Sequence, residues 1–322
     1  MHASDISGVD LNLLKIFEAL FEEGGASRAA IRLDMTQSAV SAALKRLRVL
    51  YDDRLFTPTG RGLAPTARAR ELKPVVTGAL DRVRQSLAIA SPHPASFLGR
   101  AVAIGLSDDF ELALGQPIIA QVARHAPGLR VIFRQTYSQI VSDSLASQDI
   151  DLAIAAGGFG ARGLSHQSLG QGDYACLVDA ATLPREGLTK GLGAGNSESN
   201  SALLLEDFVA RGHILVSSGG VVGIVDEALA AQGLKRTVIA STTHFAALPH
   251  LLKGTGAVAT IPRHAASAIA ALTGLRLVEC PLALPAYPIE LGWRANALRD
   301  AAVARVRDAI AACSDLLNAP RA

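Results

Sequence analysis

Polar side chains suited to nucleic acid recur at short intervals in the segment TQSAVSAALKRLR, residues 36–48. The Gln37 amide can form two hydrogen bonds to an adenine, and the small side chains of Ser38 and Ser41 allow close approach to a base edge. Lys45 and Arg48 can reach phosphates. The side chains expected to contact DNA, including one from a loop further on, are Thr36, Gln37, Ser38, Ser41, Lys45, Arg48 and Arg61.

These side chains share a surface only if residues 37–50 form a helix, and the apolar spacing predicts one. The residues expected on its buried side are Ala39, Val40, Ala43, Leu44 and Leu47. Thr36 is suited to cap its first turn. A short helix over residues 28–33, capped by Ser27, and a turn at Asp34 and Met35 precede it. An earlier amphipathic helix ends at Gly24 and Gly25.

A loop after this helix carries a further arginine. The runs YDDRLF and TPTGRGL predict two short strands around a tight loop, with Arg61 between two glycines. Such an arginine can enter the minor groove or contact a phosphate. The net charge of the chain is only +2, but residues 37–73 hold eight Lys or Arg against three acids. This local excess favours a DNA-binding helix-turn-helix with a wing over an ordinary three-helix domain with a polar surface.

A long helix is predicted from Thr66 to about residue 91, where SPHP (91–94) breaks the chain. Its apolar stripe runs through Leu72, Val76, Leu80, Val83 and Leu87. We expect this stripe to pack on a second copy of the helix, with packing on the next domain as the alternative. Pro74 can kink the helix or shift its start because it lacks a donor.

Composition and motifs exclude several classes of protein. No apolar run reaches the ~18 residues that span a bilayer, and Asp5 and Asp10 argue against a signal peptide. The three cysteines are far apart and are expected to be buried thiols in a reducing cytoplasm. The chain has no G-x-S-x-G, H-E-x-x-H or paired C-x-x-C sequence. We therefore expect no enzyme, no catalytic residue, no metal site and no cofactor.

Beyond residue 97 apolar strands alternate with helices, which predicts an α/β fold with mostly parallel sheets. The predicted strands are 100–106, 129–135, 151–155, 173–180, 213–218, 236–242, 257–262, 275–282 and 287–294, and the predicted helices follow Ser107 and span 139–148, 222–232, 245–253 and 298–317. This order fits two lobes, with crossovers near Gln171-Gly172 and Thr273-Gly274. Residues 183–202, rich in Gly, Asn and Ser, are expected to form a surface loop.

A ligand would bind where strand ends meet helix starts, because free backbone N–H groups point outward there. The residues expected to contact it are Ser107, Tyr137, Ser138, Ser217, Ser218, Gly219, His244 and Phe245. Each has a plain structural alternative: Ser107 can simply cap a helix, and His244 can be a structural histidine. Asp108 and Asp109 either favour the helix dipole or repel a carboxylate ligand.

The N-terminal quarter resembles the LysR-type transcriptional regulators. The matching stretches are DLNLLKIFEAL (10–20), SRAAIRLDMTQSAVSAALKRLR (27–48), Leu55-Phe56 and TGRGLAPTARA (59–69). The resemblance implies a winged helix-turn-helix over 1–65, a linker helix over 66–91 and a regulatory domain over 97–322. That domain resembles a type 2 periplasmic binding protein, with lobe 1 at about 97–171 and 275–322 and lobe 2 at about 172–274. Ala42 departs from the family, in which this position is usually Arg or another polar residue.

The resemblance also implies a cytoplasmic regulator that binds double-stranded promoter DNA. A small co-inducer, aromatic or carboxylic, would bind between the lobes and change the geometry of the bound DNA. Linker helices would pair two subunits, regulatory domains would join dimers into a tetramer, and RNA polymerase would be a further partner. The alternative function is a solute-binding protein with an appended domain.

Overall fold

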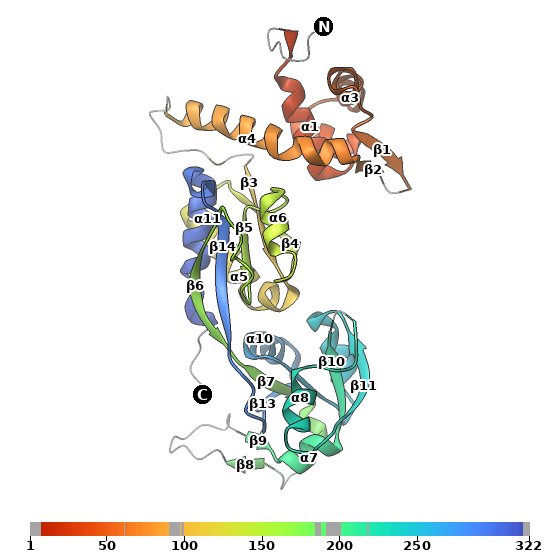
Figure 1. Ribbon diagram of the computed structural model, residues 1–322, viewed down its shortest axis with the longest axis vertical. Helices are drawn as coiled ribbons and strands as arrows, with labels where there is room; N and C mark the ends of the chain where they lie inside the picture. The colour runs from red at the N-terminus through yellow and green to blue at the C-terminus, as the bar shows by residue number, and fades with distance from the viewer. Residues whose placement is uncertain are drawn as a thin grey trace. The chain divides into compact units, whose positions relative to one another are not determined.

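The computed structural model describes residues 8–60, 62–89, 97, 100–183, 188–190, 201–217 and 219–317. The chain divides into two compact units (Figure 1). The first extends to Ser96, and the second comprises Phe97–Leu145 and Ile150–Ala322. Among the described residues, no helix is long and apolar enough to cross a membrane.

The first unit has the predicted three helices, hairpin and long helix. Their bounds are α1 (Asn12–Glu23), α2 (Ala26–Leu33), α3 (Gln37–Tyr51), β1 (Phe56–Thr59), β2 (Gly62–Pro65) and α4 (Ala67–Ile89). Phe17 is fully buried at the centre of the core, and its ring lies 5.6 Å from that of Phe56 and 6.2 Å from that of Phe21. Val40, Ala43, Leu44 and Leu47 of α3 are buried as predicted, whereas Ala39 is half-buried.

Of the two predicted helix caps, one is confirmed and the other is wrong. Thr36 caps α3 as predicted, because its hydroxyl accepts a hydrogen bond from the Ala39 N–H at 3.2 Å. The predicted cap at Ser27 is wrong. Helix α2 begins at Ala26, and extended Gly25 stands at the capping position without a side-chain hydrogen bond. Ser27 therefore lies inside the first turn.

The wing is an antiparallel pair of β1 and β2 held against the end of α1. The Leu63 N–H donates to the Gly24 carbonyl at 2.8 Å. Gly62 has φ +146°, and a Cβ there would collide with the Gly24 carbonyl oxygen. Only glycine fits this close approach of two backbones.

The apolar stripe of α4 begins within the unit itself. Val76 and Leu80 are buried in the same core as α1, with Leu72 partly buried beside them. The expectation that the whole stripe packs on a second copy is wrong for this half, because α1 already covers it. Val75 and Val83 are exposed at 69% and 51%. Pro74 lies inside the helix, which continues through it, and the Leu87 side chain lies outside the described residues.

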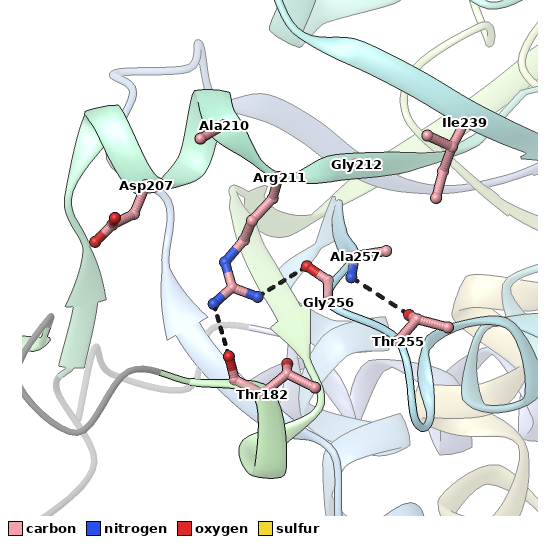
Figure 2. Close-up of a pocket in the computed structure, with 9 residues that line it drawn as sticks. All are labelled: Thr182, Asp207, Ala210, Arg211, Gly212, Ile239, Thr255, Gly256 and Ala257. Atoms are coloured by element: carbon pink, nitrogen blue, oxygen red, sulfur yellow. Dashed lines mark hydrogen bonds between the residues drawn. The ribbon is translucent and has the colours of Figure 1, made fainter.

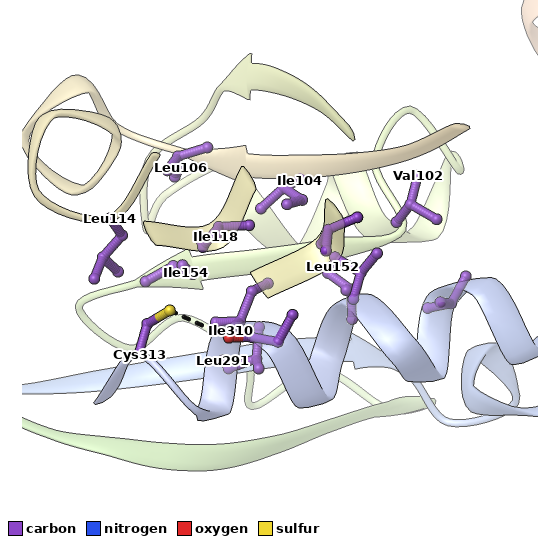
Figure 3. Packing of buried hydrophobic residues seen from close by; sticks show 14 of the residues in the cluster. Val102, Ile104, Leu106, Leu114, Ile118, Leu152, Ile154, Leu291, Ile310 and Cys313 are labelled. Carbon is purple, nitrogen blue, oxygen red and sulfur yellow. Dashed lines mark hydrogen bonds between the residues drawn. The ribbon is translucent and has the colours of Figure 1, made fainter. Parts of the chain in front are cut away.

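The second unit has two sheets, and the first is built from β3 (Ala101–Leu106), β4 (Arg130–Gln135), β5 (Leu152–Ala155), β6 (Leu164–Gly172) and β14 (Tyr287–Arg294). Their order is β4-β3-β5-β14-β6. Side chains of β3, β5 and β14 pack against α5 (Asp108–His125) and α11 (Ala301–Ala311) (Figure 3). The opposite face, with Ala153 and Ala155, packs against Val141 and Leu145 of α6 (Val141–Ala146). Short 3-10 turns, η4 (Ala297–Arg299) and η5 (Ser314–Leu316), flank α11.

The second sheet has the order β11-β10-β12-β7-β13-β9-β8. Its strands are β7 (Tyr174–Val178), β8 (Leu188–Lys190), β9 (Ser201–Leu203), β10 (Gly212–Val216), β11 (Thr237–Thr242), β12 (Val258–Pro262) and β13 (Arg276–Glu279). Its helices are η2 (Ala180–Thr182), α7 (Leu205–Ala210), α8 (Ile224–Ala230), η3 (Phe245–Ala247), α9 (Leu248–Leu252) and α10 (Arg263–Thr273). Helices α9 and α10 cover one face and α7 and α8 the other. We call the part built on the first sheet lobe 1 and the part built on the second sheet lobe 2.

The sheets are mixed rather than mostly parallel. In lobe 1, β3 pairs parallel with β4 and β5, but β14 is antiparallel to β5 and β6. Strand β6 was missed because its polar sequence, LSHQSLGQG, does not read as a buried strand. Within residues 183–202 the expected loop contains β8 and the start of β9, and its other residues lie largely outside the described ones. Helices α7 and α10 were also missed.

The chain crosses between the lobes at one predicted place and one unpredicted place. The first crossover, between β6 and β7, lies at the predicted Gly172. The second lies at residues 280–286, not at Thr273-Gly274, because β13 pairs antiparallel with β7 and so belongs to lobe 2. The lobe boundary predicted at residues 274 and 275 is therefore wrong, and lobe 2 extends through Glu279.

Candidate DNA interface and interlobe cavity

The first turns of α3 present the predicted polar side chains to solvent. Gln37, Ser38 and Lys45 are exposed and Ser41 is half-buried. The hydroxyls of Thr36 and Ser38 lie 3.0 Å apart, so the cap and the face that follows it form one polar edge. An amide, small hydroxyls and a cation on one helix face are suited to a major groove.

Arg48 forms hydrogen bonds that the sequence did not predict. Its Nε donates to the Arg54 carbonyl at 2.9 Å and its guanidinium donates to the Phe56 carbonyl at 3.0 Å. These bonds tie the end of α3 to the start of the wing. The sequence did not indicate these bonds, because a helical pattern does not relate Arg48 to residues six and eight positions later. The phosphate contact of Arg48 stays a prediction. Arg61 lies outside the described residues.

Sequence reasoning missed one basic residue at the edge of this face. Arg46 lies one turn after the exposed Ala42, and both line a hollow of about 480 Å³ beside α1. The Arg46 guanidinium forms an ion pair with Asp10 at 3.0 Å, with both side chains partly exposed. An exposed pair of this kind contributes little to stability and leaves the cation accessible. The sequence feature that could have identified Arg46 is its position four residues, or about one helical turn, after Ala42.

A cavity of about 290 Å³ lies at the junction of the two lobes. It is lined by Ser107, Asp109, Phe110, Thr136, Tyr137, Ser138, Gln139, Ile154, Ala155, Ala156, Tyr174, Pro262 and Tyr287. Three of the predicted ligand residues, Ser107, Tyr137 and Ser138, therefore come together. Thr136 and Tyr287 were missed, because nothing in their sequence neighbourhoods marks a ligand site.

The remaining predicted ligand residues are not part of this lining. The Ser217 hydroxyl accepts a hydrogen bond from the Gly219 N–H at 3.3 Å, which closes a local turn. The side chain of His244 is 64% exposed. Phe245 is held by its backbone, since its N–H donates to the Asp108 carboxylate at 2.7 Å. Ser218 lies outside the described residues.

The comparisons with known proteins cover both units. Residues 11–70 match the family model described as "Bacterial regulatory helix-turn-helix protein, lysR family", and residues 97–314 match "LysR substrate binding domain". The chain belongs to the LysR family. It is a LysR-type DNA-binding transcriptional regulator with a substrate-binding domain.

Relatives of known name and structure agree with this assignment. Nodulation protein D 2 of Rhizobium tropici is 30% identical over 317 residues, which cover 98% of this chain and 96% of that protein. The transcriptional activator NahR of Pseudomonas putida is 30% identical over 92% of this chain and 95% of its own. A crystal structure of a probable transcriptional regulator from Pseudomonas aeruginosa has a TM-score of 0.65 at 29% identity and covers 93% of this chain and 97% of its own.

The two lobes of this LysR regulator are held together by consecutive aspartates at the start of α5. Asp108 of lobe 1 accepts hydrogen bonds from the Phe245 and Ala246 N–H groups at the start of η3 in lobe 2. Asp109 accepts one from Ser107, and its other oxygen lies 3.0 Å from Nε2 of His264 in lobe 2. Neither alternative expected for these carboxylates, favouring the helix dipole or repelling a carboxylate ligand, included these contacts across the junction.

Aromatic rings form the walls of the cavity. The His264 ring stacks on Phe110 with centroids 4.7 Å apart, behind Asp109. Tyr174 follows the first crossover and Tyr287 follows the second, and their rings lie 5.3 Å apart. Burial, and then the neighbouring charge of Asp109, raises the pKa of the Tyr287 phenol far above its ordinary value. The phenol therefore stays protonated and able to donate.

A second hollow of about 500 Å³ lies at the edge of lobe 2 (Figure 2). The Arg211 guanidinium donates to the carbonyls of Gly256 and Thr182 at 2.9 and 3.0 Å. The arginine thereby ties together the loops on either side of this hollow. Its hydrogen bonds hold the fold.

Proposed function

We propose that this regulator reads operator bases with Gln37, Ser38 and Ser41 of α3 and contacts phosphates with Lys45. Thr36 holds the start of the helix at the base edge. The exposure of Gln37, Ser38 and Lys45 on the helix face that also holds half-buried Ser41 supports the proposal. Arg48 holds the start of the wing beside α3. For Arg61 we propose a contact to the minor groove or its phosphates. Arg46 is available beside Ala42, where the chain lacks the polar residue usual in the family.

The effector of this regulator occupies the interlobe cavity and contacts Ser107, Tyr137 and Ser138. The cavity is lined from both lobes, and the contacts of Asp108 and Asp109 cross the same junction. A ligand bound there changes the balance of these contacts and with it the angle between the lobes. Footprinting on the protein's own upstream DNA, with and without candidate compounds, tests this. A footprint that no cavity-binding compound alters contradicts it.

The assembly is a dimer through α4, extended to a tetramer through the regulatory domains. The exposed Val75 and Val83 support the pairing of α4, because apolar side chains on a long helix favour a partner. The regulator acts in the cytoplasm, where promoter DNA and RNA polymerase are. A solute-binding protein would have no use for a basic winged helix-turn-helix, so we do not favour that alternative.

Replacing Gln37 with Ala flattens the discrimination between operator and altered operator. A bidentate base contact is worth about 1–3 kcal/mol of discrimination. Binding to the operator and to a base-substituted operator is measured by fluorescence anisotropy at one salt concentration. An equal loss of affinity on both DNAs would mean that Gln37 does not contact a base.

Replacing Lys45 with Ala weakens binding to all sequences alike. One phosphate contact fewer lowers the slope of log K against log salt by about one unit. The measurement is the operator affinity at several salt concentrations, with Lys235 to Ala in lobe 2 as the matched control. A slope that stays the same in the Lys45 variant removes this residue from the phosphate contacts.

A further inference from the structure

The interlobe cavity contains two buried hydroxyl groups that form no hydrogen bond within the described structure. They are the Thr136 Oγ1 and the Tyr287 phenol, and both residues line the cavity. Thr136 is 1% exposed. A buried hydroxyl without a partner destabilises the fold. Because buried polar groups nearly always have a hydrogen-bond partner, we expect a molecule bound in the cavity to supply the missing hydrogen bonds.

The charges around the cavity disfavour an anion. Among the described residues that line it, none is Lys, Arg or His, and Asp109 carries the only charge. The first turn of α5 contains Asp108, Asp109 and Glu111, which already offset the positive end of its helix dipole. Arg263, next in sequence to the lining residue Pro262, donates to the carboxylates of Asp173 and Glu279 at 2.8–3.0 Å.

The lining of the cavity does not favour a cationic ligand either. Both oxygens of the Asp109 carboxylate are already engaged, one by the Ser107 hydroxyl and one by His264. An ammonium ion would have to share these oxygens with Ser107 and His264, so the carboxylate would replace only part of the hydration that the ion loses. The lining therefore favours a molecule without net charge.

The size and walls of the cavity indicate a ring compound. Phe110, Tyr137, Tyr174 and Tyr287 provide aromatic faces, with Ile154 and Ala155 between them. A cavity of about 150 Å³ holds benzene, so about 290 Å³ has room for a substituted ring. Hydroxyl or amide groups on such a ring would bond to Thr136, Tyr287 and the exposed Gln139 amide.

We infer that the interlobe cavity binds an uncharged aromatic compound bearing hydroxyl groups and discriminates against carboxylates of the same shape. The inference rests on the proposed function of this cavity and narrows its ligand class. Its structural basis is the juxtaposition of two unpartnered hydroxyls with aromatic walls and an already engaged carboxylate.

Three compounds of the same shape and different charge test it on the full-length protein. They are 4-hydroxybenzamide (neutral), 4-hydroxybenzoate (anionic) and 4-hydroxybenzylamine (cationic), titrated at pH 7.5 and followed by calorimetry. We expect the neutral compound to bind at least tenfold more tightly than either charged one. Equal or tighter binding of the benzoate or the amine, or no binding of the neutral compound, overturns the inference.

Two variants separate a ligand role from a structural one. Thr136→Val and Tyr287→Phe each lower affinity for 4-hydroxybenzamide by about tenfold, the equivalent of one hydrogen bond. Both raise the urea midpoint of unfolding, because each removes an unsatisfied buried hydroxyl. Thr237→Val, on the exposed edge of lobe 2, is the control. It changes the affinity for 4-hydroxybenzamide and the urea midpoint less than either cavity variant does. A lowered midpoint in both variants would assign the hydroxyls to the fold and contradict the inference.

A third variant distinguishes failure of the ligand class from failure of the site. Gln139→Arg adds a cation at the cavity wall, and we expect it to raise the affinity for 4-hydroxybenzoate at least tenfold. If the wild type already prefers the benzoate and Thr136→Val weakens that binding, the site stands and the ligand class is wrong. If compounds bind but none of the three cavity variants changes their affinity, the proposed site itself is wrong.

Discussion

Replacing Glu22 with Gln destabilises the DNA-reading unit by about 3–5 kcal/mol, the usual cost of removing one partner of a buried ion pair. The Glu22 carboxylate lies 3.1 Å from the Lys73 ammonium and also pairs with Arg32. The side chain of Lys73 is only 7% exposed, and its Nζ lies 5.7 Å from the centroid of the Phe21 ring. The new amide oxygen in the Glu22→Gln variant and the Thr77 hydroxyl, 3.0 Å from Nζ, can still accept hydrogen bonds from this ammonium, but neither carries the negative charge that offsets its burial.

The pKa of Glu22 depends on its burial and on the two cations beside it. Burial alone would raise it, but Lys73 and Arg32 lower it by more, so the pKa lies below its ordinary value. Its contribution to stability is therefore complete at neutral pH and is lost as the pH falls through the lowered pKa. Since this cluster joins α1, α2 and α4, its loss loosens the support of the recognition helix.

Urea unfolding followed by circular dichroism at 222 nm measures the effect. The chain has one tryptophan, Trp293 in the second unit, so its fluorescence gives an internal control that should not change. Glu71→Gln is the matched variant, because Glu71 pairs with Arg68 at the surface, with side chains 69% and 56% exposed. It should cost less than about 1 kcal/mol. Equal losses in the two variants would contradict the argument.

Lowering the pH from 7 to 5 destabilises lobe 2 by about 2 kcal/mol through His213 alone. The side chain of His213 is fully buried, with Nε2 2.8 Å from the Phe208 carbonyl and Nδ1 3.4 Å from the Arg236 guanidinium. Burial lowers its pKa most and Arg236 lowers it further, against the opposing hydrogen bond to Phe208 and the charge of Asp226. The pKa is about 4 rather than 6.5.

Stability falls at lower pH because the unfolded state of the chain binds the proton more readily than the folded state. Between pH 6.5 and 4 the unfolded chain protonates His213 and the folded chain does not. The stabilisation is therefore complete above pH 6.5 and is lost as the pH falls toward 4. Urea unfolding at pH 7, 6 and 5 measures it.

The matched pair of variants is His213→Gln and His250→Gln. The first removes the titration and flattens the dependence on pH, whatever it costs at pH 7. The second changes an exposed histidine and keeps the dependence of the wild type. A His213→Gln protein that loses as much stability between pH 7 and 5 as the wild type would contradict the assignment.

Much of the fold could be predicted because local rules decide it. Apolar spacing places α1, α3 and α4 within a few residues of their observed bounds, and Thr36 caps α3 as its type suggests. The alternation of apolar strands and helices indicates a two-lobed α/β unit. Predictions failed where the local pattern is weak, as at polar β6, or where two patterns compete, as at Ser27 beside Gly25.

The sequence by itself determined that a polar helix face and a wing stand together, since helical period and turn residues depend on neighbours only a few positions away. Only the tertiary structure decided what each face meets. It turned Arg48 to the wing, covered the first half of the α4 stripe with α1, and moved the second crossover beyond β13. It also joined Thr136 and Tyr287, 151 positions apart, in one cavity. Periodicity shows which side of an element is buried, but the partner that buries it is set by packing between distant segments.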